Sequence, residues 1–348
     1  MPSPHKARVV ILVLDALGPE FVDSERMPWL SRLAERGAAA PLGGLAELVA
    51  STGPCHATLL TGLPLASHGV LANRVFGSDG AVDPDPRVCV PTLLDRAKVA
   101  GLRTAIATSD PDILNTVNGH SADLAWPATL DISRFGVPPP KYVPDTAAAE
   151  ILIGAVRSGY DLVVGQLQGL DTVIHKHGID AAESRAARAQ LDEIVGGLTS
   201  ALADRWNETV FAVLSDHRAE DVIDPEPVRL AEALSSVADV LEDGSAALVR
   251  PHEGKLAAVL AGTLAVAGTA GICPLDDRHL VAWCEPGRVF GRDREIAVAA
   301  MHGNLTTRPC VAVLAGGHPS AAAVAETIRR APPSLRVWAP FAARALGM

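Results

Sequence analysis

Short apolar runs alternate with amphipathic segments along the first two thirds of the chain. The apolar runs have the length of buried strands and end at polar residues; they are residues 7–14, 102–108, 160–166 and 208–215. The segments between them predict helices, several of which open beside a proline or stop at a glycine; they are residues 28–36, 53–61, 92–100, 145–157 and 182–205. This alternation predicts an α/β fold with a doubly wound, mostly parallel sheet.

The pattern changes after residue 217. From there to about residue 290, turn-rich loops separate predicted helices from short strands; the helices are 225–237 and 253–267, and the strands are 246–250 and 279–285. The earlier pattern then resumes, with strands at 295–301 and 309–315 and a helix from about 319. We therefore expect a core domain from residues 1–217 and 293–348, interrupted by a small α+β cap insertion at 218–292.

Acidic and imidazole side chains follow the predicted core strands where those strands end. Because the carboxyl ends of parallel strands meet at one edge of a sheet, where such folds bind ligands, we expect these side chains to converge. Three carboxylates and three imidazoles are enough to hold two cations such as zinc, which indicates a two-metal hydrolytic site. The candidate ligands are Asp15, Asp171, His175, Asp216, His217 and His302.

A predicted helix start lies among these ligands, at Ser51-Thr52-Gly53-Pro54. We expect Thr52 at the N-cap, where its hydroxyl could simply cap the helix, as threonines often do. The same position also suits chemistry, because the free N–H groups of a helix N-terminus attract an anion such as phosphate. A threonine hydroxyl beside a metal can ionise and attack phosphorus.

Each segment taken alone also has an ordinary structural explanation. Asp171 and His175 are four residues apart, which places them on one face of a helical turn, but the pair also fits a surface loop. Asp216 and His217 could form a strand-end turn, and His302 could be a buried core histidine. The functional interpretation depends on finding all of them after strands of one sheet.

Composition narrows the class of protein. The 348 residues suit one large core with a small accessory unit, and 48% of them are hydrophobic, which is typical of a globular enzyme. A net charge of −10 without a basic cluster argues against binding duplex nucleic acid. The five cysteines form no C-x-x-C pair, and no apolar run approaches the ~18 residues of a membrane span. The N-terminus lacks a signal-peptide pattern, so we expect a cytoplasmic protein that does not bind membranes.

The order of these motifs resembles the alkaline phosphatase superfamily and, within it, the type I phosphodiesterase/nucleotide pyrophosphatase branch. The resemblance covers residues 7–110, 160–217 and 295–316. It rests on Val-Leu-Asp15-Ala-Leu-Gly, Thr52-Gly-Pro-Cys-His56, Ser67-His-Gly69 followed by Asn73, Asp171-x-x-x-His175, Ser-Asp216-His217 and His302-Gly303. It implies the alkaline-phosphatase-like fold and a metal-dependent hydrolase of phosphate esters.

The resemblance also implies a role for each matching residue. Asp171, His175 and His302 would hold one divalent cation, and Asp15, Asp216 and His217 would hold a second, toward which Thr52 bridges. Zinc is favoured for both cations, with manganese as the alternative. Thr52 would be the nucleophile that forms a covalent phospho-threonine. Asn73 and the N–H group of Gly53 would hold an oxygen of the substrate, which we expect to be a small organic phosphate ester.

Departures from the family pattern leave the substrate open. Gly53 stands where nucleotide-cleaving members usually carry an aromatic residue that stacks on the base, which weakens the case for nucleotides. Arg74 or Arg218 could reach a phosphate and favour a monoester, although both also fit solvated surface charges. The alternatives are therefore a phosphomonoesterase, a C–P hydrolase similar to phosphonoacetate hydrolase, or a non-catalytic scaffold with this fold. The sequence leaves the oligomeric state undetermined.

Overall fold

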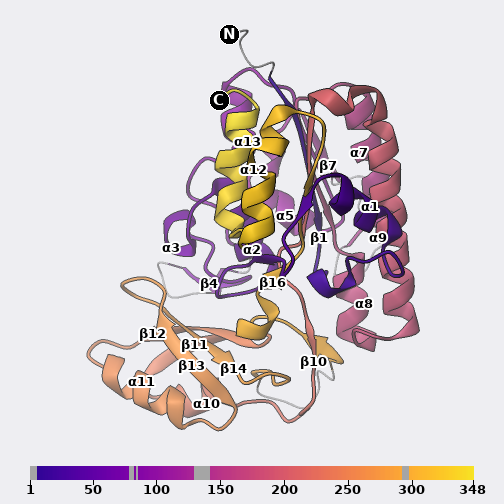
Figure 1. Cartoon of the computed structure of the whole chain (residues 1–348). Coiled ribbons are helices and arrows are strands. Elements are labelled where there is room, and N and C mark those ends of the chain that lie inside the picture. The colour runs from indigo at the N-terminus through magenta and orange to yellow at the C-terminus, as the bar shows by residue number, and fades with distance from the viewer. Residues whose placement is uncertain (1–5, 78–81, 84, 129–141, 292–297) are drawn as a thin grey trace.

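The computed structural model of the chain describes residues 6–77, 82–83, 85–128, 142–291 and 298–348. Its centre is a seven-stranded sheet with the order β2-β17-β9-β1-β8-β6-β7 (Figure 1). In that order the strands are Ala38–Ala39, Ala312–Ala315, Thr209–Leu214, Arg8–Leu14, Leu162–Leu167, Thr104–Thr108 and Leu124–Trp126. The strands from β9 to β7 are parallel, whereas β17 is antiparallel to both β9 and β2. The expected doubly wound, mostly parallel sheet is confirmed.

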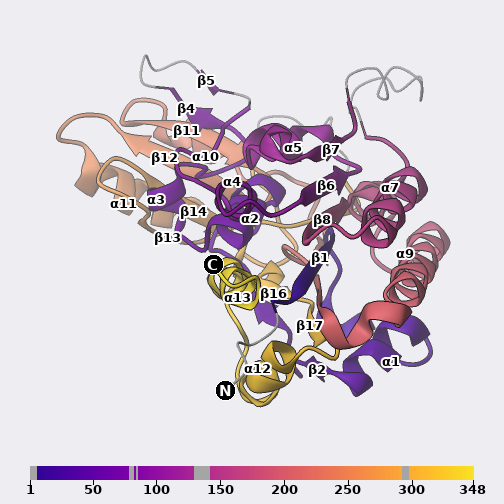
Figure 2. The same ribbon diagram turned by 90° about the horizontal axis from the view of Figure 1, so that it is seen from above.

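Helices cover both faces of this sheet, because the side chains of its buried strands alternate between two apolar clusters. In β1, Val9, Ile11 and Val13 belong to one cluster, while Val10, Leu12 and Leu14 belong to the other. The first cluster includes residues of α2 (Thr52–Thr61), α4 (Leu93–Val99), α5 (Pro111–Thr116), α12 (Pro319–Arg330) and α13 (Trp338–Ala345). The second includes residues of α1 (Pro28–Arg36), α7 (Asp145–Arg157), α8 (Gly169–His177) and α9 (Ala182–Ala201). Figure 2 shows these two helix layers on opposite sides of the sheet.

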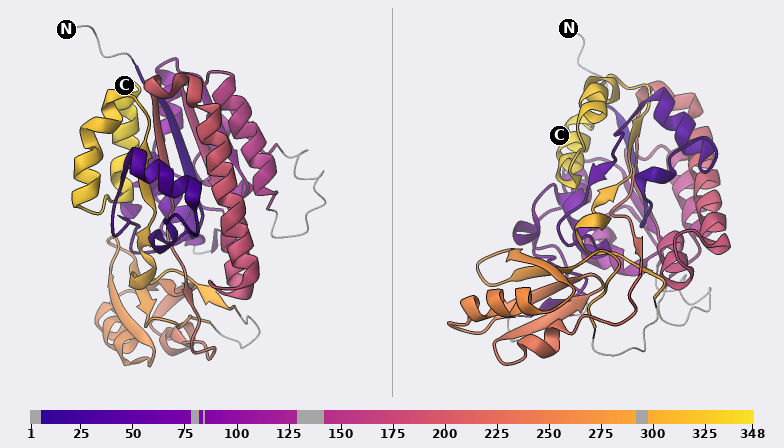
Figure 3. Two further views of the ribbon diagram at one scale, coloured as in Figure 1. Left: turned by 45° about the vertical axis from the view of Figure 1, so that its right-hand side comes forward. Right: turned by 60° about the horizontal axis from the view of Figure 1, so that its bottom comes forward.

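A second, antiparallel sheet lies at one end of the core, on the side away from the C-terminus (Figures 1 and 3). Its order is β11-β12-β14-β13, formed by Ala238–Asp243, Ala246–Pro251, Leu280–Cys284 and Thr269–Pro274. The helices α10 (Leu230–Leu234) and α11 (Leu256–Ala265) pack on it. We call this sheet and its two helices the cap. An apolar cluster that joins Val49, Leu65 and Leu71 of the core to Leu248 and Val281 fixes the cap to the core.

The loop that carries His302 meets the cap at the β11–β12 turn. Gly244 in this turn has a φ of +64°, and a Cβ placed there would lie 2.7 Å from the carbonyl oxygen of His302. Gly303 has a φ of +125°, and its Cβ would lie 2.7 Å from the backbone nitrogen of Ala246. Both positions need glycine because the conformation is left-handed and because the two backbones leave no room for a side chain.

The remaining elements are short. They are β3 (Gly44–Leu45), α3 (Leu65–His68), β4 (Val75–Phe76), β5 (Val82–Asp83), β10 (Glu220–Asp221), β15 (Ala300–Met301) and β16 (Pro309–Cys310). Single turns of 3-10 helix occur at Pro19–Phe21, Gly119–Ser121, Leu305–Thr307 and Leu335–Val337, and a longer 3-10 segment at Ala203–Glu208. Across the described ranges, no helix combines the length and the apolar character needed to cross a membrane.

Several predicted boundaries are wrong. The helix expected at 225–237 is confined to α10, and the strand expected at 309–315 is divided into β16 and β17. Of the strand expected at 295–301, only Ala300–Met301 is present in β15, while residues 295–297 lie outside the described residues. The helix predicted at 182–205 ends at Ala201. The strands β11 and β13 were not predicted, because partly exposed residues interrupt their apolar pattern.

Candidate active site

The six predicted ligands come together at the carboxyl edge of the core sheet. Asp15 directly follows β1, and Asp216 and His217 follow β9 after a single serine. Asp171 and His175 lie on α8, which begins two residues after β8. His302 directly follows β15, the short strand by which the chain returns from the cap. Segments from distant parts of the sequence therefore form one group of ligands, of which five are buried and His175 is partly exposed. Because β15 pairs with β10 in a separate two-stranded sheet, the expectation that every ligand follows a strand of one sheet is wrong for His302.

Asp15, Asp216 and His217 form an inner cluster, and each of these side chains is fully buried. The Nε2 atom of His217 lies 3.6 Å from Oδ1 of Asp15 and 3.2 Å from Oδ2 of Asp216. The ligand atoms all lie within 4.8 Å of one another, a spacing at which one cation can contact all three. The N–H of Ala16 donates to Oδ1 of Asp216 at 3.3 Å and turns Oδ2 toward the cluster.

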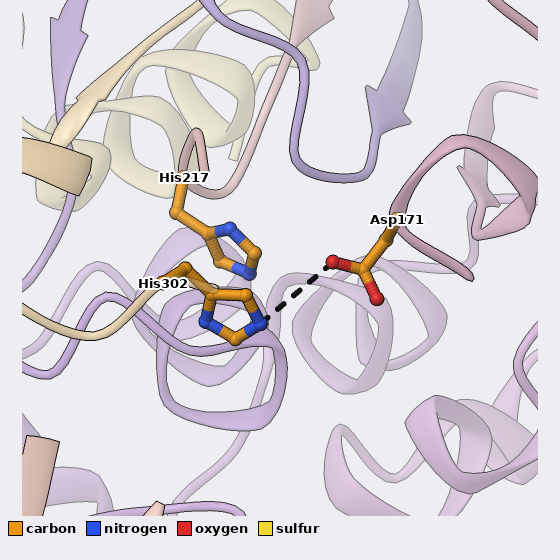
Figure 4. Close-up of side chains that lie close together, drawn as sticks. All are labelled: Asp171, His217 and His302. Atoms are coloured by element: carbon orange, nitrogen blue, oxygen red, sulfur yellow. Dashed lines mark ion pairs between the residues drawn. The ribbon is translucent and has the colours of Figure 1, made fainter. Parts of the chain in front are cut away.

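Asp171, His175 and His302 form an outer cluster. Oδ1 of Asp171 lies 3.2 Å from Nε2 of His175 and 3.7 Å from Nε2 of His302 (Figure 4). The rings of His217 and His302 stack with their centroids 3.9 Å apart, so the two clusters adjoin. Within the described part of the chain, the compact ligand group at this position is Asp171, His217 and His302. The predicted set had His175 in place of His217; His175 lies beside Asp171 but is partly exposed.

Backbone carbonyls orient two of the histidines. Nδ1 of His175 donates to the carbonyl of Ala300, and Nδ1 of His302 donates to the carbonyl of Ala50, both at 2.8 Å. Because a carbonyl only accepts, each of these Nδ1 atoms carries the hydrogen, and a neutral ring then presents a lone pair on Nε2. This arrangement is typical of histidines that bind a metal.

Burial and mutual repulsion oppose ionisation in the inner cluster. Burial, together with the charges of Asp216 and Asp171, raises the pKa of Asp15 well above its usual range. Burial and the charge of Asp171 likewise raise the pKa of Asp216 to about 8. Burial, with the neighbouring His302, lowers the pKa of His217. The inner carboxylates therefore lack a positive charge that would stabilise their ionised forms.

The outer cluster has the opposite balance. Burial favours neutral Asp171, but attraction to His175 and His302 outweighs burial, and the pKa of Asp171 lies below its usual value. Burial favours neutral His175 as well, yet the adjacent Asp171 raises the pKa of His175 to about 9. This carboxylate is stabilised by histidines and ionises readily.

Buried atoms without partners show that a cation fits the inner cluster. Among the described side chains, Oδ1 of Asp15, Oδ2 of Asp216 and Nδ1 of His217 have no hydrogen-bond partner, whereas Oδ1 of Asp171 lies 3.2 Å from Nε2 of His175. Unpaired carboxylate oxygens are costly in a protein interior unless a cation compensates them. Three carboxylates and three imidazoles form a ligand set that suits zinc. The residues present therefore fit divalent cations.

Thr52 lies beside the inner cluster, with Oγ1 3.5 Å from Nε2 of His217. Its predicted N-cap position is wrong by one residue. Ser51 has the extended backbone of an N-cap, and Thr52 is the first residue of α2. No side-chain hydrogen bond caps this helix, so the Thr52 hydroxyl has no structural task at the helix start. It lines a pocket of about 370 Å³ together with Asn73, His175 and His302.

Asn73 joins the start of α2 to the cap. Its Oδ1 accepts the N–H of Gly53 at 2.9 Å, and its Nδ2 donates to Oδ1 of Asp243 at 3.4 Å. The two groups predicted to hold a substrate oxygen are therefore adjacent and bond to each other.

The two candidate arginines have other partners. Arg74 lines the pockets near Thr52, but its guanidinium donates to the carbonyl of Glu242 at 2.8 Å. Arg218 donates to the carbonyl of Thr306 and forms an ion pair with Glu20 at 3.5 Å, outside the pocket that Thr52 lines. His56, which belongs to the motif that begins at Thr52, donates from Nδ1 to the carbonyl of Thr52 at 2.8 Å.

Sequence reasoning missed two glutamines that hold the carboxylates. Gln166 donates to Oδ2 of Asp15 at 2.9 Å and to Oε1 of Gln168 at 2.7 Å. Gln168 donates to Oδ2 of Asp171 at 2.8 Å. Both glutamines are buried. A polar residue at the carboxyl end of a buried strand was the available signal, and Gln166 occupies that position in β8.

The sequence model of the type I phosphodiesterase/nucleotide pyrophosphatase family matches residues 9–265. The chain therefore belongs to this family and is a phosphoric ester hydrolase.

Solved structures share the fold at low sequence identity. An inactive variant of murine ectonucleotide pyrophosphatase/phosphodiesterase 5, in complex with AMP, has a TM-score of 0.78 and 16% identity. This match covers 99% of the present chain and 96% of the murine one. Phosphonoacetate hydrolase from Sinorhizobium meliloti, in complex with phosphonoacetate, has a TM-score of 0.74 and 17% identity, with coverage of 99% and 96%. A comparison with curated proteins gave no match.

Proposed function

We propose that the protein hydrolyses a small organic phosphodiester, with the hydroxyl of Thr52 as nucleophile and two divalent cations as cofactors. One observation carries this proposal: Thr52 lies at a helix N-terminus, next to two adjoining clusters of carboxylate and imidazole ligands, and the buried carboxylates of the inner cluster are uncompensated. Family membership supports the reaction class.

The inner ligands Asp15, Asp216 and His217 would hold one cation, and Asp171 and His302, with His175 beside them, would hold the other. Such ions, when bound, lower the pKa of a nearby hydroxyl and stabilise charge on the attacking and leaving oxygens. Zinc suits this mixture of imidazoles and carboxylates, and manganese is the alternative.

The chain's own residues position the reacting groups. The Thr52 hydroxyl gives its proton to solvent, its oxygen forms a bond to phosphorus, and the bond from phosphorus to the leaving oxygen breaks, so that an alkoxide departs and takes a proton from solvent to become the alcohol. Water then cleaves the phospho-threonine, which releases a phosphate monoester and restores the hydroxyl. The N-terminal end of α2 faces this phosphoryl group with the positive end of its dipole. Asn73 donates from Nδ2 to a non-bridging oxygen, where negative charge accumulates.

We also propose that residues 218–292 are an insertion that forms a wall of the pocket. Asp243 and Gly244 of the cap line the same pocket as Thr52, which supports this division of the chain. The cap then contributes to the choice of substrate, while the core carries the chemistry.

Replacement of the nucleophile tests the proposal. Thr52→Ala should lower the hydrolysis of bis-p-nitrophenyl phosphate by more than about a thousandfold, because the covalent route is lost. The variant should retain its bound metal, measured by atomic emission, because all of the carboxylate and imidazole ligands remain. Thr52→Ser is the matched control and should keep measurable turnover. Wild-type turnover in Thr52→Ala would show that the nucleophile is another group.

A further inference from the structure

The tip of the β11–β12 hairpin brings one carboxylate of the cap into the candidate active site. Oδ2 of Asp243 accepts the backbone N–H of Asn73 at 3.2 Å, and its Oδ1 accepts the side-chain Nδ2 of Asn73 at 3.4 Å. Two residues further on, the N–H of Ser245 donates to the carbonyl of His302 at 2.8 Å. Asp243 lines the same pocket as Thr52. The hairpin thus contacts both a residue proposed to bind the substrate and the loop of a proposed metal ligand.

The contact with Asp243 determines how the amide of Asn73 is turned. A carboxylate only accepts hydrogen bonds, so the group of Asn73 that faces Asp243 must be its NH₂. The amide oxygen then faces the N–H of Gly53, with which it bonds at 2.9 Å. Asp243 takes one of the two hydrogens on Nδ2 and leaves the second for a substrate oxygen.

The same carboxylate places a negative charge close to the substrate's phosphoryl group. Within the described structure, Arg74 donates to the carbonyl of Glu242 and forms no ion pair with Asp243, so its positive charge reduces the repulsion from Asp243 without neutralising that carboxylate directly. Arg218 is paired with Glu20, outside this pocket. A phosphate monoester carries close to two negative charges above its second pKa of ~6, whereas a diester carries one. The repulsion from Asp243 is therefore larger for the monoester.

We propose that Asp243 is a positioning and specificity-determining residue, which orients the Asn73 amide and selects monoanionic diesters over dianionic monoesters. This inference rests on the proposed function, because it assigns the ester class to the same site. The inference predicts that removing the negative charge of residue 243 while keeping the size of its side chain changes the preference between the two esters and does not abolish activity.

Asp243→Asn is the isosteric test: its amide oxygen can still accept one of the two hydrogen bonds from Asn73, while its NH₂ group replaces the oxygen that accepts the other. The matched control is Asp239→Asn, which removes a carboxylate from the same strand, where Asp239 pairs with Arg250 at 2.9 Å. The quantities to measure are kcat/KM for p-nitrophenyl phosphate and for bis-p-nitrophenyl phosphate at about pH 8, where the monoester is a dianion. The ratio of kcat/KM for the monoester to kcat/KM for the diester should rise about tenfold or more in Asp243→Asn and stay unchanged in Asp239→Asn.

A binding measurement provides a readout that does not depend on turnover. By calorimetry, Asp243→Asn should bind inorganic phosphate about tenfold more tightly than the wild type, with little change for the monoanion dimethyl phosphate. Metal content is measured on the same samples, so that a loss of cations is not mistaken for a change in selectivity. If Asp243→Asn does not fold, Asp243→Ser removes the same charge and should give the same shifts.

The outcomes separate this inference from the proposed function. In one outcome, the wild type cleaves both esters while the ratio of kcat/KM for the monoester to kcat/KM for the diester in Asp243→Asn stays within about twofold of the wild-type ratio. That result overturns this inference and leaves the proposed function standing. An equal loss of both activities assigns Asp243 a purely structural role and also overturns it. A wild type that cleaves neither ester refutes the proposed function. The phosphate and dimethyl phosphate affinities then decide whether Asp243 selects against the dianion.

Discussion

The two ligand clusters of the candidate site differ in burial and in charge balance. The inner cluster has two carboxylates for one imidazole and is sealed from solvent, and the pKa values of both carboxyl groups are raised. The outer cluster has one carboxylate among histidines and opens to the pocket at His175, and the pKa of Asp171 is lowered. A cation in the inner cluster therefore compensates unpaired negative charge, whereas one in the outer cluster competes with protons on the histidines.

The largest effect should come from breaking the inner cluster. Asp216→Asn should cost one bound metal per chain and lower turnover by more than about a hundredfold, because outer-shell partners alone are worth about 10–100-fold. His175→Ala should have a smaller effect on metal content, since His175 is the most exposed member of the outer cluster. Atomic emission after gel filtration compares the two variants. Two metals per chain in Asp216→Asn would remove Asp216 from the ligand set.

A smaller effect should come from the glutamines, and it should be confined to one cluster for each residue. Gln166→Leu leaves Oδ2 of Asp15 without its donor, and Gln168→Leu does the same for Asp171. Each substitution should weaken metal binding by about 10–100-fold, the first at the inner cluster and the second at the outer. Competition with a chelator of known affinity resolves the two binding steps. If both variants weaken the same metal-binding step, each glutamine does not act on its own cluster.

The last effect concerns the free energy of unfolding and its dependence on pH, and it should leave metal binding unchanged. Asp110 begins α5, accepts the N–H of Asp112 at 2.9 Å, and donates its own N–H to Oε1 of Gln166. Burial, followed by the charge of Asp112, raises the pKa of Asp110 to about 7. Because the folded pKa exceeds the unfolded value of ~3.9, this residue's contribution to stability is complete below about pH 4 and is lost as the pH rises through about 7.

Asp110→Asn removes this titration and keeps the helix cap. Between about pH 4 and pH 8, the free energy of unfolding of the wild type should fall relative to that of the variant by up to about 4 kcal/mol, since each unit of a pKa shift corresponds to about 1.4 kcal/mol. Urea unfolding at several pH values, with a chelator present throughout, measures the difference. A difference that does not change with pH would show that Asp110 titrates normally.

The fold was predictable where burial controls the pattern. The strand β1 lies at the centre of the sheet and is buried along its whole length, so an apolar run that ends in Asp15 identified both the strand and the ligand. The cap was harder, because β11 is half-exposed and mixes Asp, Glu and apolar residues. Its boundaries therefore depend on tertiary contacts that leave no periodic signal in the sequence.

The site was predictable to the extent that ligands follow strands. The convergence of Asp15 and Asp216 follows from sheet topology, which the strand pattern implies. His302 follows β15, which pairs with β10 in a separate two-stranded sheet, so its position depends on tertiary packing. The sharing of His217 between the two compact ligand groups depends on side-chain directions and could not be predicted. Asp243 comes from a separate sheet, and only the three-dimensional packing of the cap brings it to Asn73.

The close backbone approach at Gly244 and Gly303 has a consequence for protein engineering. When the cap is exchanged for that of a relative to change the substrate preference, residues 243–245 of this chain should be kept. Any side chain at Gly244 would press on the carbonyl of His302 and shift that imidazole. A Cβ placed at Gly254, in the loop before α11, meets no atom within 4 Å, so this loop is free of that steric constraint and libraries that vary it should retain catalysis.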